Sequence, residues 1–358
     1  MAYTTIDIPK EHFNVITYTG NASAGNAVTG VGHQPDIMWS KRWDGGWGWQ
    51  KFDTNRGGNY RQKIIHLGSY VEDSSSNNVT AWGSDGFTLG TNSAINGTGD
   101  DVVGWNWKAG TTSGLSGGTI TPSSYSISAT SGFGIYKYSG TGSAGTIAHG
   151  LGTEPKCVIV KKTTALDSWW VYHFNTHSDT STSGQYYNVL NTTAVRATNS
   201  GAWNNTNPTS TLIHLGDGGN VNSSGSDYIM YAFAPKPGFS NIGGFKGNNN
   251  TNGPFCYTGF RPAMVIIKNA SGTEAWNCWD NKRNTPVGSK NAAYTVLEPN
   301  STAAETSGST GQVIDMLSNG FKVRTTCTEV NASNADMIYL AFAEFPIVSS
   351  NSKIGTAR

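Results

Sequence analysis

The sequence predicts an all-β protein made of three tandem β-sandwich, jelly-roll-like domains. Charged residues make up only 13% of the 358 positions and Gly occupies 45 of them, a composition that favours turns and strand faces over helix interiors. Short β-branched runs alternate with turn signals, and no long 3.6-residue periodicity is present. The third observation, a threefold internal repeat, also predicts how the chain is divided.

The repeat consists of two groups of residues whose spacing is the same in every copy. In the first group, an aromatic residue precedes a Gly by two positions, and a Pro follows that Gly by fifteen. A Lys and a Trp follow the Pro by six and fourteen positions. In the second group, an Asn precedes an Asp by five positions and an aromatic residue follows the Asp by six. The anchors are Tyr18, Gly20, Pro35, Lys41, Trp49, Asn96, Asp101 and Trp107; Tyr138, Gly140, Pro155, Lys161, Trp169, Asn222, Asp227 and Phe233; and Phe245, Gly247, Pro262, Lys268, Trp276, Asn331, Asp336 and Phe342.

The spacing of the copies predicts three domains, at residues 1–117, 118–238 and 239–358, the last ending in a short polar tail. The anchor prolines are 120 and 107 residues apart, which is the size of a small domain, so we expect each copy to have its own core. We expect each anchor Pro to begin a strand, as sheets tolerate Pro at a strand's first residue. Asp85-Gly86 and Asn319-Gly320 suit tight hairpin turns, and helix should be scarce, with one short turn near 303–305.

Charge and composition argue against several classes of protein. The net charge is +1 with no basic stripe, so we expect no nucleic-acid partner. The N-terminus lacks the pattern of a signal peptide and no run of 18 apolar residues occurs, so we expect no membrane insertion. The four Cys residues form no Cys-x-x-Cys pair and are expected to be reduced, packed thiols. We expect no cofactor and no metal.

Candidate catalytic and metal-binding groups each have a structural alternative. The adjacent acids Asp100-Asp101 and Glu72-Asp73 could form a glycosidase pair, but Asp101 recurs in all copies, which favours a turn-capping role. A calcium site at Asn96, Asp100 and Asp101 is a less favoured hypothesis than turn capping, since no calcium-binding loop of known spacing is present. His173 and His177 are four residues apart, a spacing that directs both side chains to one metal only if the segment is helical. The sequence of this segment predicts strand and loop instead. We therefore predict no enzyme and no catalytic residue.

The aromatic residues divide into a repeated column and an unrepeated cluster. Trp49, Trp169 and Trp276 recur at one column, which predicts core packing, whereas Trp43 and Trp47 have no counterparts and are flanked by Gly. We expect Trp43 and Trp47 to lie in an exposed loop. Exposed indoles can stack on a sugar face while Asp44 supplies hydrogen bonds, so Trp43, Asp44 and Trp47 are the candidate ligand-binding residues.

Several strings resemble a family of tailed-bacteriophage proteins of uncharacterised function: residues 1–7, 30–36, 105–110, 253–262, 318–324 and 341–346. The resemblance covers essentially the whole chain and implies a virion structural protein located in the virion and assembled in the host cytoplasm. A tail-associated or fibre-type protein that attaches to host-surface glycan is the first expectation. A capsid decoration, cement or assembly protein is the alternative, and a polysaccharide depolymerase is less favoured. Other virion proteins are the implied partners, and we expect a homo-oligomer.

Overall fold

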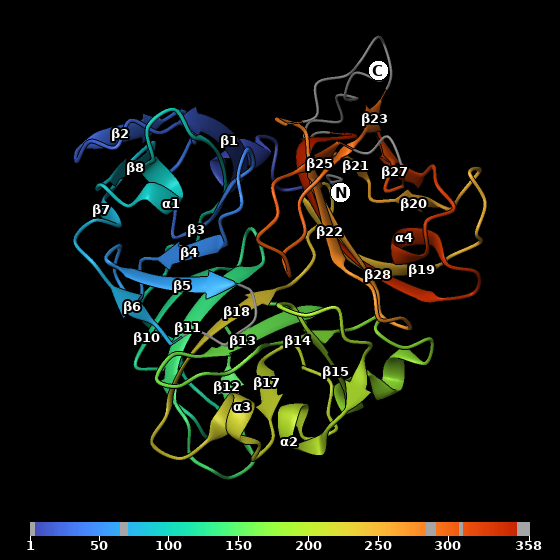
Figure 1. The fold of residues 1–358 in the computed structure, drawn as a ribbon. Helices are drawn as coiled ribbons and strands as arrows, with labels where there is room; N and C mark the ends of the chain where they lie inside the picture. The colour runs from blue at the N-terminus through green and yellow to red at the C-terminus, as the bar shows by residue number, and fades with distance from the viewer. Residues whose placement is uncertain (1–3, 65–70, 284–290, 308–310, 349–358) are drawn as a thin grey trace.

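In the computed structural model, residues 4–64, 71–283, 291–307 and 311–348 are described, and most of the predicted polar tail lies outside these ranges. The protein is all-β, with several antiparallel sheets, as the sequence predicts. Figure 1 shows three lobes around a common centre. We name them the N-terminal unit (β1 to β9), the middle unit (β10 to β18) and the C-terminal unit (β19 to β28).

Each unit contains a larger antiparallel sheet in which four strands follow the same order. In the N-terminal unit the order is β1 (Phe13–Thr19), β9 (Asp101–Trp107), β3 (Ile37–Arg42) and β4 (Trp49–Asp53), continued by β5 (Tyr60–Ile64) and β6 (Asp73–Ser74). In the middle unit it is β11 (Phe133–Ser139), β18 (Asp227–Phe233), β13 (Cys157–Lys162) and β14 (Trp169–His173), with β10 (Ser124–Ser128) before them and β15 (Tyr186–Val189) and β16 (Ala197–Thr198) after. In the C-terminal unit it is β19 (Ser240–Lys246), β28 (Asp336–Pro346), β21 (Phe260–Asn269) and β22 (Trp276–Asp280).

Smaller sheets accompany these. They are β2 (Asn26–Thr29), β8 (Gly86–Leu89) and β7 (Val79–Gly83); β12 (Gly145–Ala148) and β17 (Leu212–Leu215); β20 (Phe255–Tyr257), β27 (Gly320–Val323), β26 (Ile314–Leu317) and β23 (Ala292–Ala293); and β24 (Thr295–Val296) with β25 (Thr306–Ser307). In each unit, side chains from a larger and a smaller sheet form a hydrophobic cluster belonging to that unit alone. The predicted hairpin turns at Asp85-Gly86 and Asn319-Gly320 join β7 to β8 and β26 to β27.

The helices are single turns: α1 (Ser93–Asn96), α2 (Ser200–Trp203), α3 (Gly219–Asn222) and α4 (Thr328–Asn331), with 3-10 turns η1 (Pro9–Glu11) and η2 (Thr180–Gln185). The prediction of a helical turn at 303–305 is wrong. That segment runs along the N-terminal unit, and the N–H of Glu305 donates to the carbonyl of Trp43 in that unit instead of to a carbonyl of its own segment. Three of the single-turn helices, α1, α3 and α4, end at the anchor residues Asn96, Asn222 and Asn331.

Each anchor Asn holds the closing strand of its unit against the first loop. The Asn96 side chain accepts from the N–H of Asn21 and donates to the carbonyls of Ser23 and Gly90. Asn222 and Asn331 make the same three bonds with residues at the same offsets. A Cβ at the anchor Gly20 would lie 2.2 Å from the carbonyl oxygen of Gly97, and Gly140 and Gly247 are equally confined. These three positions require Gly because the backbone of the first loop lies directly against the backbone that follows the anchor Asn.

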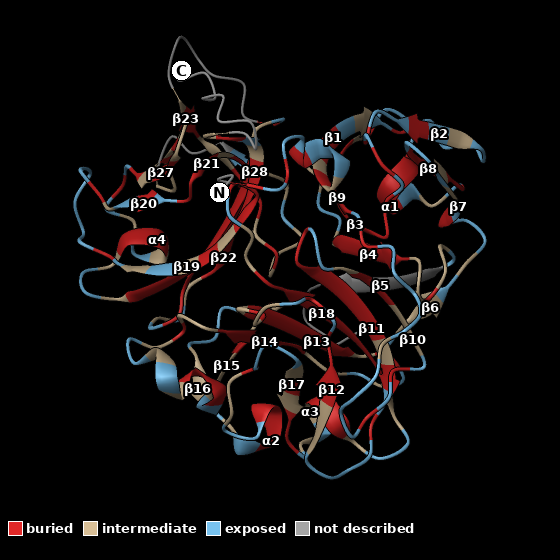
Figure 2. Ribbon diagram, turned by 180° about the vertical axis from the view of Figure 1, so that it is seen from behind, coloured by how far each residue is buried: buried red, intermediate tan, exposed pale blue. Residues whose placement is uncertain are grey.

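A fourth hydrophobic cluster is shared by all three units and was not expected from the sequence, which predicted one core for each copy. At its centre the anchor aromatics Trp107, Phe233 and Phe342 contact one another, with ring centroids 5.4–6.1 Å apart. Figure 2 shows the buried strands of the three units converging on this centre. The repeated column of aromatics therefore forms a pseudo-threefold axis within one chain.

Neighbouring units are joined in a ring by backbone hydrogen bonds at equivalent places. The N–H groups of Glu72, Arg196 and Glu305 donate to Thr163, Ala270 and Trp43, and each acceptor lies eight residues after its anchor Pro. Each bond joins one unit to the next, so the three contacts are of the head-to-tail kind that closes into a ring.

The anchor Lys residues reinforce this ring from buried positions. Lys41 donates to the carbonyl of Thr302 in the C-terminal unit, and Lys268 donates to Thr193 in the middle unit. Burial lowers the pKa of Lys41 to about 7 and the pKa values of Lys161 and Lys268 to about 8, because the charged ammonium is disfavoured away from water. Two Trp residues of the repeated column also form hydrogen bonds between units. The indole N–H groups of Trp49 and Trp276 donate to the carbonyls of Glu298 and Val189 in the adjacent unit.

Candidate functional site

The predicted ligand-binding residues occupy the loop between β3 and β4, residues 43–48. Two anchored points hold this loop in place. The carbonyl of Trp43 accepts from Glu305, and the ammonium of Lys41 donates to the carbonyl of Gly45 at 3.0 Å. These two bonds fix the first half of the loop, which presents Asp44 and leads directly to Trp47.

The three predicted residues differ in exposure. Trp47 is 41% exposed and is the only one of the twelve Trp residues among the exposed large hydrophobic side chains. Asp44 is also exposed, accepts from Arg42 Nε at 2.7 Å and caps the N–H of Asp101. Trp43 is half-buried and packs against the shared cluster, so the expectation that it is an exposed loop residue is wrong. The physical reason is the adjacent unit, which covers this side of the loop.

The residues weighed as catalytic or metal-binding candidates do not come together into one site. Asp100 pairs with Arg42 at 2.7 Å, Glu72 pairs with Arg56 at 2.9 Å, and the Asn96 side chain is occupied by backbone groups. His173 is buried at the contact of the middle and C-terminal units, whereas His177 stacks on Tyr186. Within the described ranges, no group of three or more His, Cys, Asp or Glu residues is placed to hold a metal ion.

Buried ion pairs at two of the unit contacts were missed by the sequence analysis. Asp53 and Arg56 are both buried, with Arg56 Nε 2.6 Å from Asp53 Oδ2, and Tyr231 of the middle unit donates to the same oxygen at 2.8 Å. Burial disfavours the charged guanidinium, but Asp53, Tyr231 and Glu72 together raise the pKa of Arg56. Asp280 and Arg283 repeat the pair in the C-terminal unit at 2.7 Å. The Asp-x-x-Arg spacing at the ends of β4 and β22 occurs in both copies and could have indicated this ion pair from the sequence.

The middle unit has His173 and Thr176 at these two columns. His173 Nε2 faces the carbonyl oxygen of Tyr339 at 3.2 Å, and Nδ1 accepts from the N–H of Asn175 at 3.1 Å. This arrangement fits the neutral ring only, since a proton on Nδ1 would face another N–H. Burial lowers the pKa of His173 to about 4, although the bond to Tyr339 opposes the shift.

We expect His173 to weaken the fold in acid. Its pKa is about 4 when folded and about 6.5 when unfolded, so the unfolded chain binds more protons between these values. The free energy of unfolding should fall as pH decreases from 6.5 to 4, by about 1 kcal/mol per pH unit at most from this residue. Urea unfolding at pH 7 and pH 5 should show a smaller pH effect in His173→Asn than in the wild type. His177→Asn, at a half-exposed position, is the matched control, and equal pH effects in all three proteins would contradict the assignment.

Lys51 is a second buried group that the sequence analysis missed. Its ammonium lies 3.6 Å from the ring centroid of Trp39, 4.1 Å from Trp169 and 4.5 Å from Tyr231, so three aromatic faces from two units enclose it. Burial lowers the pKa of Lys51 well below its usual value. The equivalent positions are Val171 and Cys278, which is why the repeat did not mark this residue. Lys51 belongs to the contact between the N-terminal and middle units.

A family model matches residues 8–346, which include all three units and their contacts. The chain belongs to the family DUF7483. This family is described as a domain of unknown function, and its model treats the three units as one domain. No curated protein and no solved structure shows a significant match to this DUF7483 chain. In the described part of the chain, no helix is long and apolar enough to cross a membrane.

Proposed function

We propose that this DUF7483 protein is a non-enzymatic bacteriophage virion protein, tail-associated or fibre-type, that attaches to host-surface glycan through the 43–48 loop. The phage resemblance of strings along the whole chain supports the virion assignment. The observation that carries the binding assignment is the exposure of Trp47, beside an Asp44 carboxylate whose position is set by Arg42 and Asp101.

The chemistry of the loop suits a sugar ligand. An exposed indole offers a flat apolar face for the C–H face of a pyranose ring, and a neighbouring carboxylate accepts hydrogen bonds from its hydroxyl groups. Because the loop is anchored to the C-terminal unit through Trp43 and to its own strand through Lys41, little ordering entropy is lost on binding. The proposed site therefore lies where the three copies differ, outside the shared columns of the scaffold.

The pairing of the acidic side chains supports a non-enzymatic role. A glycosidase needs two carboxyl groups facing one substrate cleft, one of them kept protonated. Asp100 and Glu72, one member of each adjacent acid pair, are engaged by Arg42 and Arg56 in contacts that hold units or strands together.

We expect Trp47→Ala to reduce binding to host-envelope glycans at least tenfold on a glycan array, because the stacking face is lost while the fold is unaffected. Phe255→Ala removes another exposed aromatic side chain, on β20, and should leave binding unchanged. Equal binding by Trp47→Ala and the wild type would refute the site. Immunogold labelling of intact virions addresses the virion assignment separately: label on the tail supports it, and label on capsids favours the decoration role.

A further inference from the structure

The middle unit has one strand more than its neighbours on the outer side of its first strand. β10, from the segment that links the first two copies, pairs with β11, with Ser126 opposite Ile135 and Ser128 opposite Phe133. It also contacts the N-terminal unit, since Ser126 Oγ donates to Asp36 at 3.4 Å and Ser124 Oγ reaches the carbonyl of Asn55 at 3.5 Å. β10 therefore fills a slot between two units.

The equivalent edge of the N-terminal unit is open in the described part of the chain. β1 is the outermost strand of its sheet and pairs with β9 alone. Backbone hydrogen bonds run from Lys108 to His12 and from Gly20 to Asp100. They show that the backbone N–H and C=O groups of the even-numbered residues of β1 point towards β9. The backbone groups of Phe13, Val15 and Thr17 therefore point to the open side, as those of Phe133, Ile135 and Lys137 point to β10.

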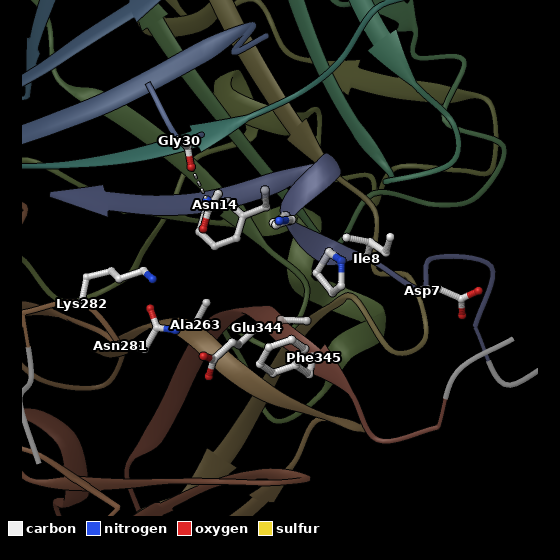
Figure 3. Close-up of a pocket in the computed structure, with 13 residues that line it drawn as sticks. Asp7, Ile8, Asn14, Gly30, Ala263, Asn281, Lys282, Glu344 and Phe345 are labelled. Carbon is white, nitrogen blue, oxygen red and sulfur yellow. Dashed lines mark hydrogen bonds between the residues drawn. The ribbon is translucent and has the colours of Figure 1, made fainter. Parts of the chain in front are cut away.

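A pocket of about 420 Å³ lies at this open edge, between β1 and the C-terminal unit. Figure 3 shows Asn14 of β1 on one side, with Asn281, Lys282 and Ala263 across from it. Glu344 and the 59%-exposed Phe345, both from β28, continue the wall. The Oδ1 atom of Asn281 is buried without a hydrogen-bond partner among the described residues.

Five of the residues that line this pocket are counterparts of residues that hold β10. Measured from the anchor Pro of each unit, Phe13 corresponds to Phe133 and Asn14 to Gly134, which pair with Ser128 and Ile127. Gly30 corresponds to Gly150, against which Ile127 lies. Ala263 and Lys282 correspond to Asp36 and Asn55, the residues that contact Ser126 and Ser124. By the same measure Asp7 and Ile8, which also line the pocket, correspond to Ile127 and Ser128, but they form no strand with β1. The pocket is therefore the counterpart of the β10 slot without a strand paired to β1.

We propose that this slot accepts an extended β-strand donated by another protein chain, by addition to the free edge of β1. The inference goes beyond the proposed glycan attachment, because it concerns how the protein is held by a partner and does not depend on the 43–48 loop. The occupant is recognised by the chemistry of β10. It presents an apolar side chain over Gly30, where Ile127 lies in the filled slot, and small polar side chains towards Ala263 and Lys282. A donor on one of these side chains would satisfy Asn281 Oδ1.

The test uses a synthetic peptide with the sequence of residues 123–130, Ser-Ser-Tyr-Ser-Ile-Ser-Ala-Thr, blocked at both ends, and the intact protein. A second peptide carries a photoreactive residue in place of Ile127. We expect saturable binding by isothermal calorimetry, and crosslinks that fragmentation of the tryptic peptide 11–41 places near Asn14 or Gly30. Thr17→Pro removes an N–H group on the open side only, which an edge strand tolerates, and should weaken binding at least tenfold. Thr17→Val is the matched control and should bind as the wild type does.

Three results would overturn the proposal. Absence of saturable binding to the wild type is one, and crosslinks confined to regions other than β1 and the loop at Gly30 are another. The third is binding that appears only in a chain shortened to end at Val348, since it would make the chain's own last ten residues the occupant. Circular dichroism of the Thr17 variants distinguishes loss of the slot from loss of the fold, and loss of glycan binding alone would leave this proposal intact.

Discussion

Replacing Arg56 with Met should lower the free energy of unfolding by about 3–5 kcal/mol, the usual effect of removing one partner from a buried ion pair. The change leaves the Asp53 carboxylate buried without its cation, and it removes the guanidinium that Glu72 accepts from. Tyr231 belongs to the middle unit, so the loss also weakens a contact between units. Urea unfolding followed by Trp fluorescence measures the change.

The middle unit supplies the control for this prediction. At the positions that correspond to Asp53 and Arg56 it has His173 and Thr176, two buried side chains that carry no charge. The double variant Asp53→His with Arg56→Thr removes both charges and should be less destabilised than Arg56→Met. A double variant as unstable as the single one would show that packing of the Arg side chain, and not the unpaired carboxylate, accounts for the effect.

Truncating Trp107 to Ala should destabilise the whole chain by about 3–5 kcal/mol, as expected for a large aromatic side chain in a packed core. Trp107 is 1% exposed and contacts Phe233 and Phe342 on the pseudo-threefold axis, so the cavity opens where the three units meet. Because the shared cluster joins all units, we expect a single unfolding transition in the wild type and in the variant.

Differential scanning calorimetry tests this directly. Trp82→Ala changes a half-buried Trp that packs against the N-terminal unit's own cluster, and it should shift the transition less than Trp107→Ala does. A Trp107→Ala protein in which one unit melts separately, with the other two unchanged, would contradict the view that the three units form one cooperative structure.

The arrangement also explains why the shared columns tolerate so little variation between copies. Most of the anchor residues act between units as well as within them. Lys41, Lys268, Trp49 and Trp276 bond to the adjacent unit, and the three closing aromatic residues contact one another. Substitution at any of them would change one contact of a closed ring. The 43–48 loop and the open edge of β1 lie where the ring is not symmetric, and there a copy can acquire its own partner.

The sequence by itself determined the all-β class, the three copies and the positions of their anchors, because turn residues, β-branched runs and fixed spacing are local properties of the chain. It also marked Trp47 as unlike the repeated Trp column. Only the tertiary structure decided which anchors meet their counterparts. Trp107, Phe233 and Phe342 join at one axis, Trp43 is covered by an adjacent unit, and Asp53 and Arg56 are buried beside Tyr231. These contacts join residues far apart in sequence, and burial by a neighbouring unit leaves no periodicity that a single copy could reveal.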